Sequence, residues 1–166
     1  MSLYEAYLND IAERKEKGLH PKPIDSSELI KEIIDYVIDE KSEQRENCLE
    51  FLIYNILPGT TDAALIKSKF LKNIILKNIE IKEISVSFAF ELLSHMKGGP
   101  SIKVLLDLAL GDNTSLAEKA SKILMRQVFL YDSDIERLKT SFNNNNAIAN
   151  KILNSYANAD FFSNLP

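Results

Sequence analysis

The sequence predicts an all-α fold, and three observations support this prediction. Glycine and proline, the strongest local breakers of regular structure, are few, and the stretches between them are long enough for helices. Apolar residues in those stretches recur at spacings of three and four, as in Leu29, Ile33 and Val37. The turn signals that a sheet protein needs every 8–12 residues are mostly absent.

Each predicted helix lies between two breakers or polar turns and carries an apolar stripe wide enough to pack against more than one neighbour. Ile84 to Phe88 alternates as a strand would. We assign this stretch to a helix entry because the apolar and helix-forming residues from Ala89 to Leu93 continue it without a break. The predicted helices cover residues 3–17, 26–40, 43–56, 61–77, 85–96, 100–110, 115–130, 133–142 and 146–157.

Helix ends are predicted from capping residues. A side-chain oxygen followed three residues later by glutamate is typical of a capping box. Glycine after a helix takes a positive φ without a Cβ clash, and proline is tolerated in a first turn. We expect capping boxes at Asp25, Ser115 and Ser133, helix stops at Gly18 and Gly98, and a helix start at Pro100.

Helices of 10–17 residues, paired by short turns every 30–40 residues, favour a helical-repeat superhelix of paired antiparallel helices. The alternative that the pattern leaves open is a closed orthogonal bundle. The length of 166 residues fits one domain covering residues 1–166.

Composition excludes several protein classes. One cysteine rules out an intramolecular disulfide and fits a reducing compartment. No apolar run is long enough to span a membrane, and the N-terminus lacks a signal-peptide pattern, so we expect a cytoplasmic protein without a membrane partner. Residues 1–50 hold seven basic and 13 acidic residues, a net of −6, and residues 51–166 hold 13 and 11, a net of +2. This balance is far from that of a strongly basic nucleic-acid-binding domain.

Residues able to carry catalysis are scarce, and we predict no catalytic and no metal-binding residue. Cys48 lies on an apolar stripe and fits a small core residue. His95 precedes a helix stop, where an imidazole interacts well with the helix dipole. Gly98-Gly99 follows a helix instead of a strand, so it does not fit a phosphate-binding loop.

Two basic clusters could meet RNA phosphates by charge attraction, although a solvated helix face explains them as well. Lys119, Lys122 and Arg126 share one helical face. Aromatic residues do not interleave with these cations, which argues against a base-stacking platform. The candidate RNA contacts are Lys67, Lys69, Lys72, Lys119, Lys122 and Arg126.

Several segments, in order, resemble one family: the N-terminal domain of the bacterial aconitate hydratase B family, the bifunctional citrate/isocitrate and 2-methylisocitrate enzyme. The likeness extends from about Tyr7 to Pro166 and rests on collinear order, not on one motif. The segments are Ile11-Ala12-Glu13-Arg14, Gly18 with Pro21-Lys22-Pro23-Ile24-Asp25, Leu57-Pro58-Gly59 with Asp62-Ala63-Ala64 and Lys67, Phe70-Leu71, Glu91-Leu92-Leu93, Met96-Lys97-Gly98-Gly99, Leu105-Leu106-Asp107, and Ser155-Tyr156-Ala157-Asn158-Ala159-Asp160-Phe161-Phe162 with Pro166.

The resemblance implies a HEAT-like superhelix that is one piece of a larger hydro-lyase. The parent family holds a [4Fe–4S] cluster on cysteines that no position here matches, so this chain alone is expected to be non-catalytic and to hold no cofactor. Met1-Ser2-Leu3 resembles a vector scar, so we expect an expressed fragment. The alternative is a free-standing helical-repeat adaptor that binds a helix or peptide in its groove. The family assigns to this domain a share in the tunnel to the active site, protein–protein contacts including dimerisation, and messenger-RNA binding.

Stiff turns are the candidate contacts with the catalytic domains of such a parent, because ordered backbone docks at little entropic cost. The alternative is that these turns only connect helices, which would require the same residue types. The candidate interdomain residues are Pro21, Lys22, Pro23, Pro58, Gly59, Met96, Lys97, Gly98 and Gly99.

Overall fold

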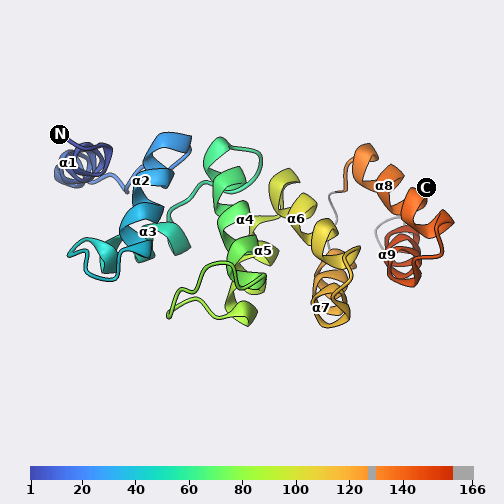
Figure 1. The fold of residues 1–166 in the computed structure, drawn as a ribbon. Helices are drawn as coiled ribbons and strands as arrows, with labels where there is room; N and C mark the ends of the chain where they lie inside the picture. The colour runs from blue at the N-terminus through green and yellow to red at the C-terminus, as the bar shows by residue number, and fades with distance from the viewer. Residues whose placement is uncertain (127–129, 159–166) are drawn as a thin grey trace. The chain divides into compact units, whose positions relative to one another are not determined.

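The computed structural model describes residues 1–126 and 130–158. These residues form nine α-helices and no strand, so the predicted all-α class is confirmed (Figure 1). The chain divides into two compact units, Met1–Leu92 and a second unit that begins at Leu93. The helical-repeat arrangement and the single domain over residues 1–166 stay predictions.

The first unit holds four complete helices: α1 (Leu3–Glu16), α2 (Ser27–Ile38), α3 (Arg45–Tyr54) and α4 (Asp62–Ile75). Helix α2 packs against α1, α3 and α4. Its stripe of Ile30, Ile33 and Val37 is completely buried, and Leu52 of α3 and Leu71 of α4 are buried as well. The stripe read from the sequence is therefore the centre of this unit's core.

Helix α5 (Val86–Met96) contains the boundary between the units, and the second unit continues with α6 (Gly99–Ala109), α7 (Thr114–Leu124), α8 (Asp132–Asn143) and α9 (Ala147–Ala157). Helix α7 packs against α6 and α9, and α8 packs against α9. The predicted helix over 115–130 ends at Leu124 in the structure, and residues 127–129 lie outside the described part.

The ambiguous entry to α5 is helical from Val86, as predicted. The Ser85 hydroxyl accepts a hydrogen bond from the Phe88 N–H at 3.1 Å. A serine that satisfies a first-turn N–H in this way favours a helix start over a strand.

The predicted capping boxes are wrong, because each helix starts one or two residues from the predicted cap. Ser26, not Asp25, precedes α2. Asn113, not Ser115, caps α7 by accepting from the Leu116 N–H at 3.1 Å. At α8 the N-cap is Tyr131, whose N–H donates to Asp134.

Two further helix ends were predicted from glycine, and the structure confirms one of them. Gly18 ends α1 with φ +69, as predicted. At the end of α5 the prediction is wrong: Lys97 takes the positive φ, +45, whereas Gly98 is extended at −145 and precedes α6. Pro100 lies in the first turn of α6, where its missing N–H leaves no helical hydrogen bond unmade.

Ser2 caps α1, so Met1-Ser2-Leu3 takes part in the fold. The Ser2 hydroxyl accepts from the Glu5 N–H at 3.1 Å, and the Glu5 carboxylate accepts from the Ser2 N–H at 2.8 Å. Both contacts of a capping box are present. Within the described ranges, no helix is long and apolar enough to cross a membrane.

Candidate functional site

The predicted corner Pro21-Lys22-Pro23 is exposed but firmly held. The Tyr7 hydroxyl donates to the Lys22 carbonyl at 2.7 Å and accepts a hydrogen bond from the Asn55 side-chain amide. Tyr7 itself is buried, and burial raises the pKa of its hydroxyl to about 12. This buried hydroxyl therefore fixes the main chain of the corner.

The corner at Pro58-Gly59 lies beside the first one. Residues 24 and 56 form an isolated parallel β-bridge, in which the Ile24 N–H donates to the Asn55 carbonyl and the Leu57 N–H donates to the Ile24 carbonyl, both at 2.8 Å. Pro58 is exposed, and Gly59 is half-buried with φ +94. The bridge thus joins two predicted contact corners that are more than 30 residues apart in the sequence.

The corner at Met96 to Gly99 offers less surface than the sequence suggested. Met96, Gly98 and Gly99 are buried. The Gly98 carbonyl accepts from the Ser101 hydroxyl at 2.8 Å, which helps fix the start of α6. Lys97 is the residue of this corner that is exposed.

Lys67 is the predicted RNA contact that the structure places inside the protein. Only 5% of its surface is exposed, and its ammonium donates to the Ile53 carbonyl at 3.0 Å. Desolvation by burial lowers the pKa of Lys67 to about 8. Lys67 therefore joins α4 to the C-terminal end of α3 and presents no charge to a ligand at the surface.

The other predicted RNA contacts lie closer to solvent. Lys69 is exposed on α4, whereas Lys72 is half-buried. Lys119 and Lys122 of α7 are exposed, as is Arg126 just beyond its end. Lys119 and Lys122 lie three residues apart on α7, and Arg126 extends this exposed basic stripe past the end of the helix.

Lys122 and Arg126, together with residues from the end of α5, line a hollow of about 400 Å³. We call it the basic hollow. All its lining residues belong to the second unit, and none is acidic. They are Ser94, His95, Lys97, Lys122, Ile123 and Arg126.

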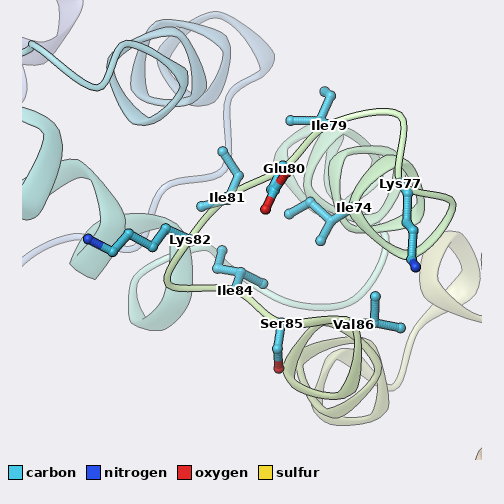
Figure 2. Close-up of a pocket in the computed structure, with 9 residues that line it drawn as sticks. All are labelled: Ile74, Lys77, Ile79, Glu80, Ile81, Lys82, Ile84, Ser85 and Val86. Atoms are coloured by element: carbon cyan, nitrogen blue, oxygen red, sulfur yellow. The ribbon is translucent and has the colours of Figure 1, made fainter.

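The first unit has a hollow of different chemistry, of about 370 Å³, between the end of α4 and the start of α5 (Figure 2). Ile74, Ile81, Ile84 and Val86 contribute apolar lining. Figure 2 shows the Lys82 side chain extending away from the others, so its charge does not close the hollow. Lys77, Glu80 and Ser85 also line it, so this hollow mixes apolar side chains with groups of both charges.

Comparison of the sequence with known protein families identifies the family of this chain. A family model described as the aconitate B N-terminal domain matches residues 6–162. The chain belongs to the aconitate B N-terminal domain family. The family resemblance read from the sequence is thus confirmed.

Curated relatives of this aconitate B N-terminal domain are named aconitate hydratase B. Those of Escherichia coli (strain K12) and Salmonella typhimurium are each 29% identical over 166 residues, and that of Pseudomonas aeruginosa is 29% identical over 167 residues. In all three comparisons the match covers 99% of this chain and 18% of the relative. The chain therefore spans less than a fifth of the length of these relatives.

The iron–sulfur cluster that the family implies does not fit the residues of this aconitate B N-terminal domain. Such a cluster is held mainly by several cysteine thiolates, and the sequence has one cysteine. Cys48 is completely buried, and burial raises the pKa of its thiol to about 11, which disfavours the ligating thiolate. Among the described residues there is no group of three or more His, Cys, Asp or Glu placed to hold a metal ion.

Sequence reasoning found Lys97, Lys122 and Arg126 but assigned them to two different roles, because nothing local links the end of α5 to α7. It placed His95 at a helix end, where the structure has it, without relating it to α7. Ser94 was not singled out, and Ile123 was read only as part of an apolar helix stripe. No sequence signal links Lys97 to Lys122 and Arg126, because the hollow forms only when α5 and α7 pack in the second unit.

Proposed function

We propose that this chain is a non-catalytic scaffold and interaction domain of an aconitate hydratase B, which as a whole interconverts citrate and isocitrate through cis-aconitate. One observation carries the proposal: the chain matches the N-terminal domain of that family over residues 6–162 but has a single, buried cysteine. The hydro-lyase chemistry and the cluster then belong to other parts of the parent protein.

The two bridged corners support a docking role in the first unit. Pro21, Lys22, Pro23 and Pro58 are exposed, while Tyr7 and the Ile24–Ile56 bridge hold the main chain beneath them. A surface that is already ordered loses little conformational entropy when it binds. We infer that this face meets the catalytic domains and contributes to the wall of the tunnel to the active site.

The non-catalytic role is tested by measuring cis-aconitate hydration with the purified 166-residue chain after iron–sulfur reconstitution. We expect no turnover above the buffer rate. Turnover by the chain itself, or a natural gene product that ends near residue 166, would contradict the proposal.

The docking role is tested in the longer protein that the proposal requires, with Lys22→Glu as the corner variant and Lys15→Glu as its control. Lys15 is an exposed lysine in the last turn of α1. We expect Lys22→Glu to change KM or resistance to proteolysis between domains, while Lys15→Glu leaves both unchanged. Equal behaviour of the two variants would remove the corner from the proposed interface.

RNA binding is a second candidate function, favoured by the exposed stripe Lys119, Lys122 and Arg126. Binding through phosphates weakens steeply as salt rises. We expect an RNA titration to show binding at low salt that is lost at high salt and lost in a Lys119→Glu/Lys122→Glu variant. Absence of binding at low salt, or indifference to the double substitution, would exclude this function for the stripe.

A further inference from the structure

We propose that the basic hollow is a binding site for a small oxyanion that carries two or more negative charges. The side chains that carry the site are Lys97, Lys122 and Arg126. The inference concerns this chain's own residues and does not depend on the proposed function.

The charge pattern of the hollow is unusual for this protein. The chain has 24 acidic and 20 basic residues, so carboxylates to pair with are plentiful. Elsewhere Arg45 pairs with Glu83, and Arg137 pairs with Asp107. Around the basic hollow, by contrast, no carboxylate among the described residues contributes to the lining. Gathered cations without a countercharge repel one another, and a bound anion relieves that repulsion.

Helix α7 places two of the cations together. Lys122 lies in the last turn of α7 and Arg126 follows the end of the helix, and both side chains line the basic hollow. Glu118 precedes Lys122 by one turn, the spacing that favours a Glu–Lys ion pair. Over residues 1–126 and 130–158 the structure nevertheless forms no ion pair between Glu118 and Lys122. The Lys122 ammonium therefore remains available to a ligand.

The backbone at the end of α5 places the third cation. Lys97 has φ +45, a conformation that residues with a Cβ adopt at an energetic cost. Gly98 and Gly99, which follow it, are buried. A lysine held in this turn projects from a fixed position, so less ordering is needed when an anion binds.

The side chains that line the basic hollow indicate which class of ligand it binds. Ammonium and guanidinium groups donate charge-assisted hydrogen bonds to phosphate and carboxylate oxygens, and the guanidinium fork binds two oxygens at once. The volume of about 400 Å³ equals the liquid volume of roughly a dozen water molecules. Inorganic pyrophosphate and citrate are both of suitable size and charge, and they represent the phosphate and carboxylate sources of this chemistry.

Calorimetric titrations of the 166-residue chain with pyrophosphate and with citrate test the proposal, with sodium chloride at matched ionic strength as the blank. We expect at least one of the two anions to bind at millimolar concentration or below. Binding of one alone assigns the ligand to the phosphate or the carboxylate source. Binding of neither would overturn the proposal.

Substitutions inside and outside the lining test whether the anion binds in the basic hollow. Lys122→Glu/Arg126→Glu is expected to weaken binding by about tenfold or more, because each lost charge-assisted contact costs a large part of the affinity. Lys119→Glu is the control, because Lys119 is exposed on α7 outside the lining. We expect it to leave affinity within about twofold. An equal loss of affinity in the double variant and in Lys119→Glu would indicate general charge attraction and would overturn the proposed site.

A second measurement keeps the test valid if the double variant folds poorly. In the unaltered chain, amide NMR shifts on adding the anion should be largest at Lys97, Lys122 and Ile123. Lys97→Gln, which removes one charge without reversing it, should reduce the affinity while the thermal unfolding midpoint stays near that of the parent. Shifts confined to residues outside the lining would overturn the proposal.

Discussion

The ammonium of Lys67 donates a hydrogen bond to the main-chain oxygen of Ile53 across 3.0 Å. Ile53 lies in the last turn of α3, where carbonyl groups lack helical partners and the helix dipole is negative. A buried cation thus satisfies a carbonyl group at a helix end. The same burial makes the residue sensitive to pH.

We expect Lys67 to make the free energy of unfolding rise with pH between 8 and 9. Burial lowers its pKa from 10.5 to about 8. In this window the unfolded chain therefore binds more protons than the folded chain, and stability rises with pH. At 1.36 kcal/mol per pKa unit the gain from pH 8 to 9 is about 1 kcal/mol.

Urea unfolding of the unaltered chain and of Lys67→Met, at pH 7, 8 and 9, measures this effect. Cys48 acts in the opposite direction above pH 9, because burial raises its pKa from 9.0 to about 11. The difference between the two proteins isolates Lys67, since both contain Cys48. Parallel pH profiles would contradict the prediction.

The Arg45–Glu83 pair is expected to lose its contribution in acid. The two guanidinium nitrogens donate to the two carboxylate oxygens at 2.6 and 2.8 Å, and this bond is the main cause that lowers the pKa of Glu83 to about 2. A depressed carboxyl pKa stabilises the fold above pH 4.5, and the contribution is lost as pH falls toward 2.

Glu83→Gln tests this prediction by thermal unfolding at pH 3, 4 and 6. The side chain of Glu83 is 41% exposed, so solvent screening limits the loss at pH 6 to roughly 0.5–1 kcal/mol. The two proteins should converge as pH falls from 4 to 3. A constant difference across the three pH values would show that the substitution acts through packing.

The corrected cap of α7 predicts unequal effects of two neighbouring substitutions. Asn113→Ala removes the oxygen that accepts from the Leu116 N–H, so we expect a loss of about 1 kcal/mol in unfolding free energy. Ser115→Ala is the control, because Ser115 is exposed inside the first turn. Chemical denaturation of both variants decides between them: a larger loss for Ser115→Ala would restore the cap predicted from the sequence.

Tyr7→Phe is expected to loosen the corner at residues 21–23. It removes the donor to the Lys22 carbonyl and the acceptor for Asn55. Leaving these partners unsatisfied costs about 1–3 kcal/mol. Hydrogen exchange at the Ile24 amide should accelerate in this variant relative to amides in the centre of α2, and unchanged exchange at Ile24 would show that the bridge holds the corner without Tyr7.

Much of the helical layout could be predicted because its causes are local. The stripe Ile30, Ile33 and Val37 has helical spacing, and it is the buried face of α2. Caps were less predictable, because Asp25 and Ser115 compete with Ser26 and Asn113, neighbours of similar capping ability, and because the N-cap of α8 is Tyr131, where the Asp134 carboxylate accepts from the N-cap N–H. A shift of one or two residues at a helix start changes which side chain reaches a free N–H.

The sequence by itself determined the helical class, the approximate position of each described helix and the family, because apolar spacing and collinear segments are properties of the chain order. The tertiary structure decided which charges are available. Lys67 and Lys69 are two residues apart, yet one is buried against α3 and the other is exposed. Lys97 and Lys122 are 25 residues apart, yet both line one hollow. Burial and convergence depend on packing between helices, which no local pattern specifies.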